Sequence, residues 1–74
     1  MIQDFILYSS IGCHLCEQAL EICQQLAISV QVVDIVEDDK LVSLYGTHIP
    51  VLERKADQQQ LFWPFTAQQI RELI

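Results

Sequence analysis

Two cysteines, Cys13 and Cys16, are separated by two residues and are the clearest chemical feature of this sequence. They lie where the apolar run Phe5-Ile6-Leu7-Tyr8 and a short polar loop lead into a helical pattern. A pair at this spacing can close into a small reversible disulfide or expose a thiolate of low pKa. The pair is therefore a candidate for thiol–disulfide exchange.

The position of each cysteine in the predicted helix gives it a different role. If the helix begins near Cys13, the sulfur lies among unpaired N–H groups at the positive end of the helix dipole, which favour a thiolate. Cys16 lies about one turn further on and nearer to the apolar face, within reach of a mixed disulfide on Cys13. We predict that Cys13 attacks and Cys16 resolves. A protonated His14 would favour the thiolate and Glu17 would oppose it, so the sign of their combined effect stays open.

Cys23 and the two histidines are the further candidates for metal ligands. Cys23 lies two helical turns, roughly 10 Å, beyond Cys16, and we predict that it is a buried core thiol. A structural zinc site needs about four nitrogen or sulfur ligands. Besides the cysteine pair the sequence offers only His14 and His48, so no metal site is predicted within one chain.

Hydrophobic periodicity predicts the elements that hold the pair. Apolar and β-branched runs predict strands at residues 4–8, 29–35, 49–53 and 60–63. Three- and four-residue apolar spacing predicts helices at residues 14–27, from Asp38 or Asp39 to Gly46, and after Thr66, which forms a capping box with Gln69. The order β-α-β-α-β-β-α makes a small α/β domain over residues 1–74, a four-stranded mixed sheet flanked by three helices. The first two strands are expected to be parallel and the last two to form an antiparallel hairpin.

Length and composition narrow the possible functions. The 74 residues are 51% hydrophobic with two glycines and two prolines, which is typical of one compact core. A net charge of −6 disfavours binding to nucleic acid or to an anionic membrane surface. No stretch approaches the roughly 18 apolar residues of a membrane span, and no basic targeting segment opens the chain. We expect a soluble, cytoplasmic monomer.

The sequence resembles the glutaredoxin-like proteins of the thioredoxin fold superfamily, in particular a small bacterial group with a CHLC motif. The resemblance spans essentially the whole chain and rests on Leu7-Tyr8-Ser9, Gly12-Cys13-His14-Leu15-Cys16-Glu17, Asp34, Tyr45-Gly46, Ile49-Pro50-Val51-Leu52 and Trp63-Pro64-Phe65. It implies a cis peptide at Ile49–Pro50 that faces the cysteine pair, where the Ile49 backbone pairs with a bound thiol substrate. With these two residues, His14 and His48 complete the predicted substrate-binding set.

The sequence departs from typical glutaredoxins around the expected glutathione pocket. Those proteins carry CPYC or CGFS, a Thr-Val-Pro segment and a Gly-Gly-Asp-Asp-like stretch. Here His48 stands at the threonine position, and residues 62–66 read FWPFT without a glycine pair. His48 could reach Cys13 as a proton carrier or lie in a solvated loop, and both interpretations stay open. The resemblance implies glutathione as a co-substrate, and these departures leave open whether this chain uses it.

These observations predict a thiol–disulfide oxidoreductase that reduces or exchanges disulfides of a protein or small-thiol substrate through Cys13 and Cys16. It needs no bound cofactor, and either glutathione or a thioredoxin-type reductant would restore the dithiol. Two alternatives stay open. One is a non-catalytic binding or adaptor module of the thioredoxin fold, and the other is iron–sulfur or other metal binding between two chains.

Overall fold

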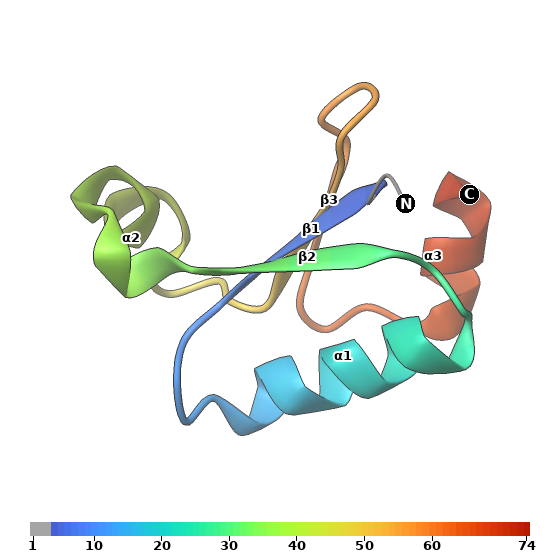
Figure 1. The fold of residues 1–74 in the computed structure, drawn as a ribbon, viewed down its shortest axis with the longest axis horizontal. Coiled ribbons are helices and arrows are strands. Elements are labelled where there is room, and N and C mark those ends of the chain that lie inside the picture. Colours follow the sequence, from blue (N-terminus) through green and yellow to red (C-terminus); the bar gives the residue numbers. More distant parts are fainter. Residues whose placement is uncertain (1–3) are drawn as a thin grey trace.

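A four-stranded mixed sheet forms the centre of the computed structural model, which describes residues 4–74 (Figure 1). In space the strands follow the order β2-β1-β3-β4. Their bounds are β1 (Phe5–Ser9), β2 (Val30–Asp34), β3 (Val51–Arg54) and β4 (Gln60–Phe62). β1 pairs parallel with β2 and antiparallel with β3, and β3 and β4 form an antiparallel hairpin. The predicted mixed sheet is confirmed. The expectation that no targeting segment opens the chain falls on residues 1–3, which lie outside the described residues.

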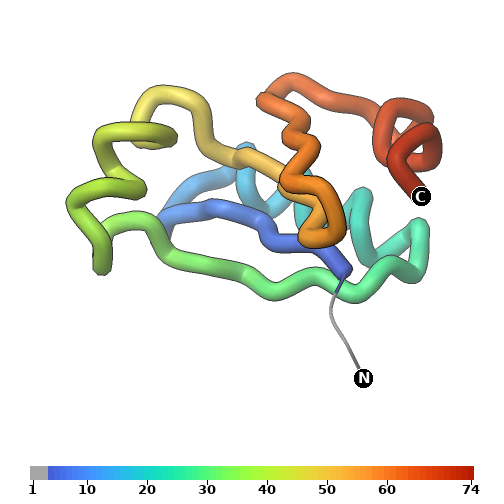
Figure 2. The backbone as a smooth tube through the Cα atoms, turned by 90° about the horizontal axis from the view of Figure 1, so that it is seen from above, coloured from blue at the N-terminus to red at the C-terminus, as the bar shows by residue number. Residues whose placement is uncertain are grey.

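Three α-helices flank the sheet, as predicted: α1 (His14–Gln25), α2 (Asp39–Tyr45) and α3 (Ala67–Leu73). α1 and α3 share one face of the sheet, because both contribute to the same buried cluster. α2 follows β2 at one end of the sheet (Figure 1). Figure 2 shows that the loop before α1 lies towards this same end, and that the β3–β4 turn and α3 lie towards the other.

The core lies between the sheet and the pair α1 and α3. Along β1 the side chains alternate, so Phe5 and Leu7 are buried while Ile6 and Tyr8 face the other side of the sheet. Leu7 stands opposite Leu52 of β3. The other buried members of the cluster are Ala19 and Cys23 of α1, Phe65, and Ile70 of α3.

Local hydrogen bonds fix the ends of the helices. Thr66 and Gln69 form the predicted capping box at the start of α3, with hydrogen bonds of 2.9 and 3.2 Å between side chain and backbone. α2 ends at Gly46 as predicted, but Gly46 has a right-handed backbone conformation. The glycine is needed there for space, because a Cβ atom would lie 2.6 Å from the carbonyl oxygen of Val42.

Several element ends differ from the prediction. α1 ends at Gln25 and not at residue 27, because Leu26 caps the helix and Ala27 turns the chain with a φ of 57°. Apolar periodicity cannot reveal this turn, since both residues continue the apolar pattern. β3 begins at Val51 and not at residue 49, because Pro50 has no N–H to donate to a strand.

Two further local features were missed or placed wrongly. A 3₁₀ helix, η1 (Ile35–Glu37), follows β2, and the Asp34 carboxylate caps it by accepting the Val36 N–H at 3.0 Å. Leu15 fits the apolar spacing of the helix predicted at residues 14–27 but is 43% exposed, because it lies in the first turn, at the edge of the stripe that packs on the sheet. Within residues 4–74, none of the helices is long and apolar enough to cross a membrane.

Candidate active site

The loop between β1 and α1 places Cys13 directly before the first residue of the helix, His14. Gly12 has a φ of +79°, a left-handed conformation that glycine adopts without steric cost. The Cys13 N–H then donates to the Ser10 carbonyl at 3.2 Å, which closes the turn. As a result Cys13 is the N-cap residue of α1, in the extended conformation that such residues adopt.

Cys13 uses its sulfur in the way that serine or aspartate uses oxygen at a helix start. The Cys13 Sγ atom accepts a hydrogen bond from the Cys16 backbone N–H at 3.1 Å. A thiolate at this position would gain from the same donor and from the positive end of the α1 dipole. The local geometry therefore favours the anionic form of Cys13 once the pair is reduced.

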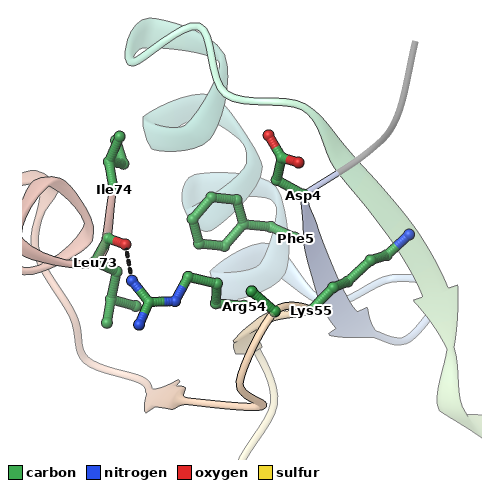
Figure 3. A pocket seen from close by; sticks show the side chains of 7 residues that line it. Asp4, Phe5, Arg54, Lys55, Leu73 and Ile74 are labelled. Carbon is green, nitrogen blue, oxygen red and sulfur yellow. Dashed lines mark hydrogen bonds between the residues drawn. The ribbon is translucent and has the colours of Figure 1, made fainter.

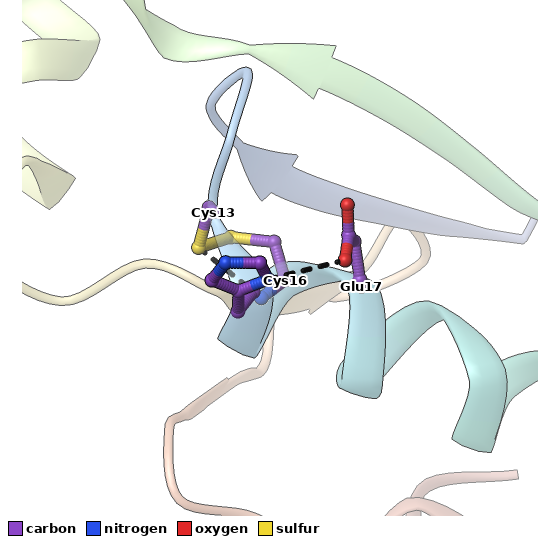
Figure 4. The surroundings of a disulfide bond; sticks show 4 residues. Cys13, Cys16 and Glu17 are labelled. Atoms are coloured by element: carbon purple, nitrogen blue, oxygen red, sulfur yellow. Dashed lines mark hydrogen bonds and ion pairs between the residues drawn. A yellow bond between two sulfur atoms is a disulfide. The ribbon is translucent and has the colours of Figure 1, made fainter.

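The two cysteines are joined in a disulfide with a Cα–Cα distance of 5.2 Å, and they differ in accessibility (Figure 4). Cys13 is partly exposed, whereas Cys16 is only 3% exposed and belongs to the buried side of α1. A molecule from solution can therefore approach Cys13 and not Cys16. This is the asymmetry that the helical position of the two residues predicts.

His14 and Glu17 interact with each other at the protein surface. The His14 Nδ1 atom lies 3.5 Å from a Glu17 carboxylate oxygen, and the two side chains are 91% and 73% exposed. His14 and Glu17, which were expected to have opposite effects on the Cys13 thiolate, therefore form one solvent-exposed pair. Glu17 lies one turn into α1, close to Cys13 and Cys16 (Figure 4).

A small cavity of about 200 Å³ lies beside the cysteine pair. Ser9 at the end of β1, residues 10–12 of the loop, Cys13 and Cys16 form one part of its lining. The rest is Glu17 and three apolar side chains, Leu7, Leu20 and Val32. Sequence reasoning missed this cavity, because it joins residues of β1, α1 and β2 that only the parallel crossover brings together.

The peptide bond between Ile49 and Pro50 is cis, as the resemblance implies. The Pro50 side chain is fully buried. The Ile49 N–H donates to the Tyr45 carbonyl at 3.0 Å. Backbone pairing of a substrate with Ile49 would therefore use the carbonyl group or displace this bond. A second cis peptide, at Trp63–Pro64, was not predicted.

His48 is exposed, and its ring packs on Phe62 with a centroid distance of 5.4 Å. Its backbone N–H donates to the Tyr45 carbonyl at 2.8 Å. The exposure of His48 fits a solvated loop residue, and its role as a proton carrier for Cys13 stays a prediction. The aromatic contact arises because β4 brings Phe62 alongside the segment that precedes β3.

A comparison with protein families places the chain. The profile described as Glutaredoxin-like domain (DUF836) matches residues 4–74. The chain belongs to this family. Among solved structures, the glutaredoxin-like chain is similar to the X-ray structure of the structural genomics target protein XcR50 from X. campestris. The two share 38% sequence identity over 93% of this chain and 92% of that chain, with a TM-score of 0.85.

Two more distant structures share the fold of this glutaredoxin-like chain. Protein Ne2328 from Nitrosomonas europaea is 22% identical over 100% of this chain and 95% of its own, with a TM-score of 0.84. The glutaredoxin from Archaeoglobus fulgidus is 17% identical over 97% and 86% of the respective chains, with a TM-score of 0.69. A comparison with curated proteins gave no match.

Tyr8 has a structural role on the sheet face opposite to the core of the glutaredoxin-like chain. Its ring stacks on Tyr45 of α2 at 4.6 Å, and its hydroxyl donates to the Glu53 carboxylate at 3.3 Å. The Gln60 amide donates to the same carboxylate at 2.8 Å and to the Tyr45 hydroxyl at 2.6 Å. Burial and the Glu53 charge raise the pKa of Tyr8 to about 12. These four residues fix α2 to the sheet.

Cys23 and Phe65 lie in the core, and Trp63 packs against it. Cys23 is 1% exposed, as predicted, and burial raises the pKa of its thiol to about 11. Phe65 is buried, and Trp63 packs edge-on against it at 5.2 Å. Across residues 4–74, no three histidine, cysteine or acidic side chains gather as metal ligands would.

A second cavity, of about 500 Å³, lies at the opposite end of β1 from the cysteines (Figure 3). It is larger than the one beside the disulfide but contains no cysteine or histidine. Asp4, Phe5, Arg54 and Leu73 are part of its lining. The Arg54 guanidinium donates to the Leu73 carbonyl and to Asp57, so it holds the hairpin turn against the end of α3.

Proposed function

We propose that this protein is a thiol–disulfide oxidoreductase, in which Cys13 is the nucleophile and Cys16 resolves the mixed disulfide. One observation carries the proposal: the sulfur of the partly exposed Cys13 accepts the backbone N–H of the buried Cys16 at the start of α1. Membership of the glutaredoxin-like family supports the same chemistry. The protein acts as a monomer in the cytoplasm and needs no bound cofactor.

The reaction transfers two electrons from the protein dithiol to the substrate disulfide. The Cys13 thiolate attacks one sulfur of the substrate, a mixed disulfide forms, and the other substrate sulfur leaves as a thiolate and takes a proton from water. Cys16 then loses its proton and attacks the Cys13 sulfur. The Cys13–Cys16 disulfide forms and the second substrate thiol is released. One external dithiol, or two molecules of a monothiol, then donate two electrons, restore the Cys13–Cys16 dithiol and are themselves oxidised to a disulfide.

Replacing each cysteine in turn tests this assignment. Cys13→Ser should abolish disulfide reduction, whereas Cys16→Ser should accumulate mixed disulfides that are visible by mass spectrometry under non-reducing conditions. Cys23→Ala is the matched control and should keep the activity, because Cys23 is buried away from the pair. If Cys13→Ser and Cys16→Ser both reduce disulfides like the parent protein, the assignment of the two cysteines is wrong. A parent protein that reduces no disulfide would instead favour the non-catalytic binding module.

The physiological reductant is the second part of the proposal. Ile49, Pro50, His48 and His14 are proposed to contact the substrate. Few basic side chains are present that could hold a carboxylate of glutathione, and Lys40, our candidate among them, is exposed on α2. We expect a thioredoxin-type reductant to restore the dithiol faster than glutathione does. Mixing the oxidised protein with each reductant and counting free thiols over time would decide between them.

A further inference from the structure

The structure points to a substrate class for the proposed oxidoreductase, so this inference rests on the proposed function. We propose that the cavity beside the cysteine pair receives a lysine or arginine side chain that flanks the disulfide of a polypeptide substrate. Three groups of observations carry the proposal: the cavity's position, the chemistry of its lining, and the distribution of charge over the molecule.

The position of the cavity ties it to the reacting sulfur atoms. Cys13 and Cys16 both contribute to its lining. A substrate whose sulfur bonds to Cys13 must therefore place residues next to its own cysteine at or near this cavity. At about 200 Å³ the cavity can take part of one side chain and not a whole small-molecule ligand.

The lining suits a long side chain with an apolar stem and a cationic head. Val32, which is 51% exposed, and Leu20 present an apolar surface, and the buried Leu7 lies beneath them. Glu17 also lines the cavity, and its side chain is 73% exposed, so its carboxylate stands at the solvent-facing rim. Lysine and arginine lay their methylene groups along apolar surface and keep the charge at the water interface. His14 now contacts Glu17, but at 91% exposure it can move aside without loss of packing.

The distribution of charged side chains also favours a cationic substrate, because acidic residues gather at the end of the molecule that carries Cys13. The last residue of β2 and the segment that follows it lie at the end of the sheet shared with the loop before α1 (Figure 2). Together they carry four acids and one base: Asp34, Glu37, Asp38, Asp39 and Lys40. At the opposite end the charges nearly cancel, because Arg54, Lys55 and Arg71 lie there together with Asp4, Asp57 and Glu72. The end that carries Cys13 is therefore negative.

This distribution favours cationic over anionic disulfides. The molecule measures 29 × 24 × 20 Å, which is comparable to the Debye length of about 30 Å at 0.01 M salt and exceeds the value of about 10 Å at 0.1 M. At low salt the acidic end attracts a cationic substrate and repels the anionic disulfide of glutathione. At high salt only the short-range contact with Glu17 keeps its effect.

Three peptide disulfides test the proposal. They are the disulfide-linked dimers of acetyl-Gly-Cys-X-amide in which X is lysine, glutamine or glutamate. The reduced protein is mixed with each dimer, the reaction is stopped by alkylation, and the oxidised fraction is measured by mass spectrometry. Each rate constant is divided by that for dithiothreitol with the same dimer, which removes differences in the intrinsic reactivity of the peptide. At low salt the lysine dimer should react about tenfold faster than the glutamate dimer, the scale expected of electrostatic steering.

Two charge-neutralising variants of the same helix separate the cavity from general attraction. Glu17→Gln should lower the ratio of lysine to glutamine rates several-fold. Glu21→Gln removes the same charge one turn further along α1, outside the cavity lining, and should leave that ratio near the parent value. Equal effects of the two variants would overturn the cavity as the recognition site, and so would equal rates for the three dimers. If the protein reduces none of the dimers, the proposed function itself fails and this inference with it.

Discussion

Cys13 and Cys23 show how position along one segment gives the same side chain opposite chemistry. The Cys13 sulfur meets the N–H groups at the start of α1, where a negative charge is stabilised. Cys23 is buried among Leu7, Leu52 and Ile70, and its pKa is raised to about 11. A buried thiol with such a pKa carries almost no thiolate at neutral pH. Exchange chemistry is therefore expected of the pair alone.

Tyr8 predicts a stability change at alkaline pH. Its pKa is about 12 in the folded protein, against 10.0 for the free side chain, so the folded state holds the proton more tightly. This contribution to stability is complete below pH 10 and is lost as the pH rises from 10 to 12. Tyr8→Phe should lower the free energy of unfolding at neutral pH, and its gap to the parent should narrow across that interval. Urea denaturation at a series of pH values measures the gap.

Glu53→Gln provides the control for this effect. Burial is the first cause of the raised Tyr8 pKa, and the Glu53 charge is the second. In this variant Tyr8 should ionise at a lower pH than in the parent but still above 10.0, as followed by tyrosinate absorbance. A gap between Tyr8→Phe and parent that stays constant from neutral pH to 12 would contradict the assignment.

The burial of the cysteines could be predicted from the sequence, whereas the contacts of the aromatic residues could not. Helix start and apolar stripe are local patterns, so the exposed Cys13 and the buried Cys16 and Cys23 could be predicted. The partners of Tyr8 and His48 are Glu53 and Phe62, which β3 and β4 bring alongside. Such contacts depend on strand order, which local pattern does not determine.

At the scale of elements, α3 depends on its capping box. Thr66 accepts the Gln69 N–H at 3.2 Å, and this bond satisfies a donor that the helix itself cannot. Thr66→Ala should therefore lower the free energy of unfolding by about 1 kcal/mol. Thr47→Ala is the matched control, since Thr47 is exposed in the turn after α2 and should cost no more than about 0.5 kcal/mol. Thermal or urea unfolding of both variants measures the difference.

The elements themselves were predictable, and their ends were less so. Alternating and helical apolar patterns located the four strands and three helices, because each element buries one face. The end of α1 depends on the turn at Ala27, and η1 depends on the Asp34 carboxylate that caps it. These are single-residue events inside runs whose composition still resembles the neighbouring element.

For the whole molecule, stability rests on a small core. Leu52 is 0% exposed and stands opposite Leu7 at the centre of the sheet. Leu52→Ala should cost about 2 to 5 kcal/mol. A protein of this length has a total stability of roughly 4 to 11 kcal/mol, so the variant should lose a large part of it in urea denaturation. Leu44→Ala, on the exposed surface of α2, is the control and should change stability little. Equal losses in the two variants would contradict this view of the core.

Asp4 and Ile74 line the same cavity, at the end of the molecule away from Cys13. A linker attached near Asp4 or at Ile74 would leave the Cys13–Cys16 disulfide at the end of the molecule that points away from the linker. Immobilised on a bead, an electrode or a phage coat through that end, the protein would present its redox pair to the solution. With Cys13 as the proposed nucleophile, the Cys16→Ser variant on such a support should retain its substrates as mixed disulfides, which could then be identified.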